Sequence, residues 1–185
     1  MQRCVSVILF IAMAVGCQHA RHRAHAVPTS QAVRDAEASG LTPPVNDPAL
    51  AAVVVPPVGW KAEPLKETDK HKHQIWLSPT GNTAYGIIFF TMPWPVGQDL
   101  ALWGFLQQMK RTEGEATLIS KKEDDDLPGV RFIAQGGLYL VRTNLIIDGY
   151  YGWAIYAGTV RGKPVDESEL QTAEQAREQT RVITP

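Results

Sequence analysis

The segment Thr83–Thr91 constrains the fold more than any other stretch, because it predicts a strand that is apolar on both faces. Side chains alternate between the two faces of a strand. One face would carry Ala84, Ile88 and Phe90, and the other would carry Tyr85, Ile87 and Phe89. A strand buried on both faces needs further structure on each side of its sheet. We therefore expect Thr83–Thr91 at the centre of a sheet that is covered on both faces.

Strands are also expected before and after this segment, where β-branched and aromatic residues gather between turn signals. Their predicted ranges are Trp60–Leu65, His73–Ser78, Ala116–Lys122, Val130–Gln135, Leu138–Ile147 and Tyr150–Arg161. Asp148-Gly149 separates the last two and is a strong hairpin signal. With a two-residue turn, Ile147 faces Tyr150. Counting back along both strands then places Arg142, Asn144 and Trp153 on one face of the hairpin.

Two helices complete the pattern. Asp99 is expected to cap the first, which runs to about Thr112 and ends at Gly114. Asp166, with Glu169 three residues later, predicts the start of a second helix that runs to about Arg181. The order of elements indicates an α+β fold, an antiparallel sheet of five to six strands with one inserted helix and one C-terminal helix.

The first seventeen residues have the layout of a secretory signal, with Arg3 followed by an apolar run from Val5 to Val15. Ala14-Val15-Gly16-Cys17 resembles the lipobox of bacterial lipoproteins. That resemblance implies cleavage before Cys17 and lipidation of its thiol. The alternative is an ordinary signal peptide that is cut after Ala14 or after the Ala24-His25-Ala26 triplet.

The chain is expected to divide into a signal peptide, a tether and a domain. Residues 1–16 are the expected signal peptide. Residues 17–56 are rich in proline and alanine without a hydrophobic period, which predicts a flexible tether. Residues 57–185 are long enough for one domain with its own core. Gln18 follows the lipidated cysteine where some lipoproteins carry a retention aspartate. By that resemblance we expect an outer-membrane anchor facing the periplasm.

The element order and Pro57-x-Gly59-Trp60 together resemble the PsbP-like family. The resemblance implies an α/β/α sandwich and a role in binding or assembly. This family has no shared active site, so the resemblance transfers no catalytic residue to this chain.

Little in the sequence indicates catalysis. The chain has a net charge of −1, which offers no electrostatic footprint for nucleic acid. Cys4 lies inside the signal and Cys17 is the lipidation site, so the mature domain would carry no free thiol for a nucleophile or a thiolate zinc site. His71 and His73 lack a third ligand nearby, and the acidic run Glu123–Asp126 lacks the spacing of a calcium loop. We expect no metal, no cofactor and no enzymatic activity.

The best candidate ligand site is the hairpin set Arg142, Asn144 and Trp153, since a guanidinium and an amide beside an indole can receive a carboxylate or a sugar. Three functions remain open. The first is a non-catalytic, lipid-anchored envelope protein whose domain binds a protein partner or assists assembly. The second is a carrier or sensor that holds a small molecule at this set, and the third is a hydrolase.

Overall fold

The computed structural model describes residues 40–124 and 129–185, in which the chain forms two antiparallel sheets and two helices. The larger sheet has eight strands in the order β3-β5-β6-β10-β9-β8-β7, with β4 also paired to β5. These strands are β3 (Lys61–Ala62), β4 (Lys66–Glu67), β5 (His71–Leu77), β6 (Thr83–Thr91), β7 (Ala116–Asp124), β8 (Gly129–Gly136), β9 (Tyr139–Asp148) and β10 (Tyr151–Val160). The smaller sheet, in the order β1-β2-β11, consists of β1 (Val45–Asp47), β2 (Ala52–Val54) and β11 (Arg181–Val182).

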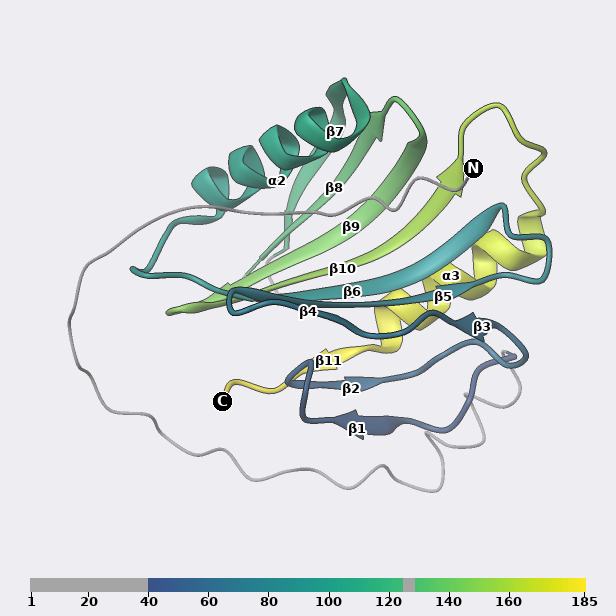
Figure 1. Ribbon diagram of the computed structural model, residues 1–185, viewed down its shortest axis with the longest axis horizontal. Helices are drawn as coiled ribbons and strands as arrows, with labels where there is room; N and C mark the ends of the chain where they lie inside the picture. The colour runs from purple at the N-terminus through teal and green to yellow at the C-terminus, as the bar shows by residue number, and fades with distance from the viewer. Residues whose placement is uncertain (1–39, 125–128) are drawn as a thin grey trace.

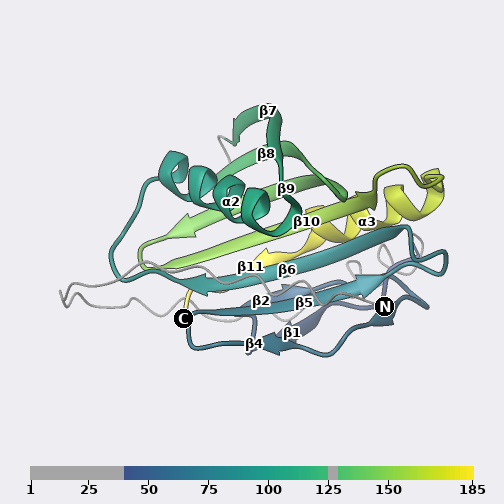
Figure 2. The same ribbon diagram turned by 45° about the horizontal axis from the view of Figure 1, so that its top comes forward.

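The helices lie on opposite faces of the larger sheet (Figure 1). α2 (Gln98–Glu113) packs on β7, β8 and β9 through Leu102 and Met109, and the turned view shows it standing over that half of the sheet (Figure 2). α3 (Glu167–Gln179) packs on β6 and β10. Its buried Ala173 belongs to the same core as the smaller sheet. The predicted α+β class is confirmed.

The prediction of a two-faced central strand is also confirmed. β6 covers the predicted range Thr83–Thr91 and lies between β5 and β10. Tyr85 and Ile87 are fully buried in the core on the α3 side. Ile88 and Phe90 pack into the core on the α2 side. The apolar residues on both faces of this segment therefore correctly predicted that it is a central strand of the sheet.

Two finer predictions are wrong. The larger sheet has eight strands instead of five to six, and a second sheet of three strands accompanies it. The predicted tether also does not extend to Pro56. β1 and β2 lie within it, and Leu41, Leu50 and Val55 are buried in the core. These strands are too short to give a periodic signal between the prolines. Cys17 and the rest of the predicted signal peptide lie outside the described residues.

The β9–β10 hairpin forms as predicted, but with a different register. Asp148 pairs with Tyr151, and Trp153 pairs with Ile146 instead of Asn144. The turn residues are therefore Gly149, at a φ of 60°, and Tyr150, which has no positive φ. This is the pattern of a type II′ turn, which needs glycine only at its first central position. The register moves by two residues, so each side chain keeps its predicted face.

The helix ends were predicted in part. Asp166 caps α3 and accepts hydrogen bonds from the backbone N–H groups of Ser168 and Glu169. The Glu169 side chain does not close a capping box, because its carboxylate accepts from the Thr80 backbone N–H and hydroxyl at 3.1 and 2.6 Å. The first residue of α2 is Gln98, and its N-cap residue is Gly97, which provides no side-chain hydrogen bond. Asp99, the predicted cap, therefore lies inside the first turn of the helix.

Neither described helix has both the length and the apolar character that crossing a membrane requires.

Candidate functional site

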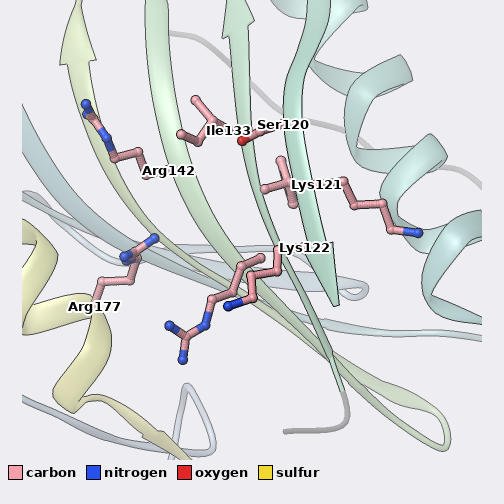
Figure 3. Close-up of a pocket in the computed structure, with 8 residues that line it drawn as sticks. Ser120, Lys121, Lys122, Ile133, Arg142 and Arg177 are labelled. Atoms are coloured by element: carbon pink, nitrogen blue, oxygen red, sulfur yellow. The ribbon is translucent and has the colours of Figure 1, made fainter. Parts of the chain in front are cut away.

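A groove lies on the α3 side of the larger sheet, beside α3, which covers β6 and β10 and only touches β9. It encloses about 230 Å³ and is lined by residues from β7, β8, β9 and α3. They are Ser120, Lys121, Lys122, Arg131, Phe132, Ile133, Arg142 and Arg177. Figure 3 shows Arg142 on β9, Arg177 on α3 and Lys122 on β7 around this space. Four of these residues, Lys122, Arg131, Arg142 and Arg177, are cations on the α3 side of the sheet.

The strand register explains why these cations meet. Lys122 pairs with Arg131, and Arg131 pairs with Asn144, so the three side chains form one row across β7, β8 and β9. Directly paired residues in an antiparallel sheet point to the same face. Lys121 has the opposite orientation and extends toward α2 (Figure 3). Its Nζ lies 2.6 Å from Oδ1 of Asp99, at the start of that helix.

The two arginines nearest α3 are each held by a carboxylate of that helix. Arg142 Nε lies 2.9 Å from Glu174 Oε1, and Arg177 Nη2 lies 3.1 Å from Glu178 Oε1. Both guanidinium groups keep a buried nitrogen without a hydrogen-bond partner among the described residues, Nη1 of Arg142 and Nε of Arg177. A buried donor left without a partner costs about 1–3 kcal/mol. Such a group calls for a partner beyond these side chains, such as an ordered water or a bound ion.

Desolvation adds to this cost at Arg177, a residue that is only 9% exposed. Burial lowers the pKa of its guanidinium, and the nearby positive charge of Arg131 lowers it further, while Glu178 and Glu174 raise it. The side chain stays charged, since an arginine is protonated throughout the physiological range. Glu178 and Glu174 outweigh the repulsion from Arg131, so desolvation is the main cost that a bound anion would offset at this side chain.

The three predicted ligand residues share the α3 side of the sheet, but the structure does not bring them into one site. Arg142 lines the groove. Asn144 is 6% exposed in the neighbouring row, and its Oδ1 has no partner among the described residues. Trp153 is fully buried, and its Nε1–H donates to the Leu50 carbonyl at 3.0 Å. The prediction that Trp153 belongs to a ligand site is therefore wrong, because its indole is a core side chain.

Sequence reasoning missed Lys122, Arg131 and Arg177. A signal for Arg177 existed: it stands seven residues after Leu170 and four after Ala173, at the spacing of the buried stripe of α3. A charged residue at such a position is seldom buried without a partner. No local sequence pattern marks Lys122 and Arg131, because the pairing of β7 with β8 and of β8 with β9 brings them together.

The two histidines are bonded to protein groups. His71 Nδ1 lies 2.9 Å from the Thr68 hydroxyl, and His73 Nε2 lies 2.7 Å from the Tyr156 hydroxyl. Desolvation lowers the pKa of His73 to about 4, with smaller contributions from Lys66 and His71. In the described part of the chain, no three metal-ligating side chains gather in one place. Of the acidic run Glu123–Asp126, the last two residues, Asp125 and Asp126, lie outside the described residues.

No protein family model matches this chain, and no curated protein matches it. Among solved structures, the chain is similar to the crystal structure of a protein from Bacteroides thetaiotaomicron, with 11% sequence identity and a TM-score of 0.38. The match covers 75% of this chain and 47% of the other, so this chain spans less than half the length of that neighbour.

Proposed function

We propose that this protein is a non-catalytic binding module of the cell envelope, anchored through lipid on Cys17, whose groove at Arg142 and Arg177 receives an anionic ligand. The observation that carries the proposal is that the buried Arg177 and the half-buried Arg142 each keep a nitrogen without a partner among the described residues, beside an open groove. Hydrogen bonds between guanidinium groups and anions are charge-assisted and strong. A carrier or sensor role for a small anion fits this arrangement.

Thermal unfolding of the full chain in the presence of anions tests the anion-binding role. A ligand that binds only the folded state raises the unfolding midpoint by mass action. We expect citrate, succinate or inorganic phosphate to raise it for the wild type and for the control Lys61→Gln, on β3 at the opposite end of the larger sheet from β7. Arg142→Gln should abolish the rise. A midpoint that no anion moves, or one that moves equally in Arg142→Gln, would show the proposal to be wrong.

The anchor is tested separately, by the intact mass and membrane partitioning of wild type and Cys17→Ala. We expect a lipid-sized mass increment on a chain that begins at Cys17, lost in the variant. A soluble, unmodified chain would contradict the proposal of a lipid anchor. The proposal of anion binding in the groove would not be affected by that result. The PsbP-like resemblance also stays a proposal, which the two helices on opposite faces of the larger sheet support.

A second candidate function is docking of a protein partner along β7, the last strand of the larger sheet in the described residues. Trp103 is 57% exposed and Ile119 is 54% exposed. An ion pair between Asp99 of α2 and Lys121 of β7 joins these two elements. Trp103 stands one turn after Asp99 on the same flank of α2, so it also borders β7. Exposed apolar residues at a sheet edge are typical of interaction sites.

Mild crosslinking in envelope extracts tests this second function. We expect a partner that wild type and Arg142→Gln both recover and that Trp103→Ser loses. Equal recovery by Trp103→Ser would exclude the β7 edge as the docking surface.

A further inference from the structure

Glu174 on α3 acts on both arginines that border this helix. Its Oε1 lies 2.9 Å from Arg142 Nε, and its negative charge raises the pKa of Arg177, which stands three residues later on the same helix. Glu178 supplies a second carboxylate, 3.1 Å from Arg177 Nη2. Among the described residues, Arg177 therefore has two acidic neighbours on α3, whereas Arg142 forms an ion pair with Glu174 alone.

The ion pair with Glu174 keeps Arg142 from an anion in the groove. Nη1 of Arg142 is buried, and Figure 3 shows the side chain extending away from Lys122, which lines the groove from β7. The glutamate also offsets the guanidinium charge that would attract an anion. Arg142 can therefore present its N–H groups to a ligand only after its side chain turns away from Glu174.

The Arg142–Glu174 pair is the one that can open at little cost. Its two side chains are 27% and 37% exposed, so water screens their attraction and solvates both groups when they separate. Arg177 is much less exposed, and it keeps Glu178 as its partner when Glu174 moves. An incoming anion can thus release Arg142 without leaving a buried cation unpaired.

An oxyanion is the kind of ligand that can replace Glu174. Arginine presents its N–H groups in a planar fork that matches two oxygens of a carboxylate or a phosphate. Glu174 is itself a carboxylate at this fork, so an oxyanion that takes its place offers the same charge-assisted contact. Arg142 exchanges one anionic partner for another and remains neutralised.

From these contacts we infer that Glu174 is an autoinhibitory residue of the groove, whose carboxylate holds Arg142 in the free protein and is displaced from it by the anionic ligand. This inference rests on the proposed anion-binding function and adds to it the residue that limits the affinity.

Isothermal titration of the full chain in nonionic detergent tests the inference, with citrate and inorganic phosphate as probes. Glu174→Gln keeps the size of the side chain and removes its charge. We expect it to bind both anions about fivefold more tightly than the wild type, because the ligand no longer competes with a half-exposed ion pair. Glu167→Gln is the matched control. It removes an exposed carboxylate two turns earlier on α3, outside the groove lining, and should leave both affinities unchanged.

The Nε–H resonance of Arg142 adds a readout of the displacement itself. Proton–nitrogen correlation spectra show arginine Nε–H groups, and the Arg142 signal is identified by its loss in Arg142→Lys. Without ligand, the wild type and Glu174→Gln should give different Arg142 signals. With saturating citrate, the two signals should coincide, because Glu174 no longer holds the guanidinium group. A wild-type signal that citrate binding leaves in place would overturn the inference.

The remaining outcomes separate the inference from the function on which it rests. Weaker or equal binding by Glu174→Gln would show that Glu174 positions Arg142 or has no part in binding, which overturns the inference and leaves the anion-binding function standing. Binding by Glu174→Gln alone would support the inference, since the wild-type carboxylate would then exclude the anion. Binding of neither probe by any of the three proteins would count against both.

Discussion

The Trp153 indole is a stability element of the core. It is fully buried, its ring packs against Phe89 at 5.4 Å between centroids, and its N–H donates to the Leu50 carbonyl. Trp153→Phe keeps most of the packing and removes the hydrogen bond, so we expect unfolding in urea to show a loss of about 1–3 kcal/mol. Anion binding in the groove should stay unchanged. Wild-type stability together with lost binding would contradict this assignment.

The His73 imidazole makes stability depend on pH. Its folded pKa of about 4 lies below the unfolded value of 6.5. Between these values the unfolded chain binds a proton at this position that the folded chain does not. The stabilising contribution is therefore full above pH 6.5 and is lost as pH falls toward 4, by up to about 3 kcal/mol.

Urea unfolding at a series of pH values measures this dependence. We expect His73→Gln to flatten the decline between pH 6.5 and 4. His71→Gln serves as the matched control: burial also lowers the pKa of His71, but that residue lies at the start of β5 and bonds to Thr68. An equal flattening in both variants would show that the decline does not arise at His73.

At the scale of elements, the cap of α3 is the clearest local signal in the sequence. Asp166 Oδ1 accepts from the Ser168 and Glu169 backbone N–H groups at 2.9 and 3.2 Å. Asp166→Ala leaves both donors to water, so we expect a lower free energy of unfolding in urea. Asp166→Asn, which keeps the acceptor oxygen, should retain most of the stability. An equal loss in both variants would indicate that charge, and not the cap, is responsible.

The elements also show what the sequence could and could not predict. β6 and α3 were predicted because a two-faced apolar strand and a capped amphipathic helix leave local patterns. β1 and β2 were missed since three-residue strands have no period. The Leu50 carbonyl between them accepts a hydrogen bond from Trp153, a residue far along the chain, and no local pattern shows such a contact. The candidate site was predicted at Arg142 alone, because the row through Arg131 depends on how β7, β8 and β9 pair, and no local sequence pattern shows that pairing.

At the scale of the whole molecule, the groove results from an unequal covering of one sheet. α2 packs over β7 to β9 on one face, and α3 with the smaller sheet packs over β6 and β10 on the other. The α3 side of β7 and β8 therefore has polar and charged residues, while the opposite side of the same strands carries the buried Phe132 and Ala134. The sheet is wider than the area that either helix covers. Its covered parts form the core, and the uncovered part forms a charged surface.

The position at which the fold begins gives a last test at this scale. Leu41 and Leu50 are fully buried, Val55 is 1% exposed, and β2 joins β1 to β11. Burial of each such side chain contributes about 1.5–3 kcal/mol, so the loss of all three approaches the 5–15 kcal/mol that holds a typical domain together.

We therefore expect a chain that starts at Gly40 to unfold cooperatively and to keep the near-ultraviolet circular dichroism of the full chain. A chain that starts at Val58 would lack the Leu50 carbonyl that receives the Trp153 N–H and the strand that pairs with β11. It should lose the tryptophan signal and the cooperative transition. Cooperative unfolding of the Val58 chain at the midpoint of the full chain would show that residues 40–57 are only an attached segment, and that the core closes without them.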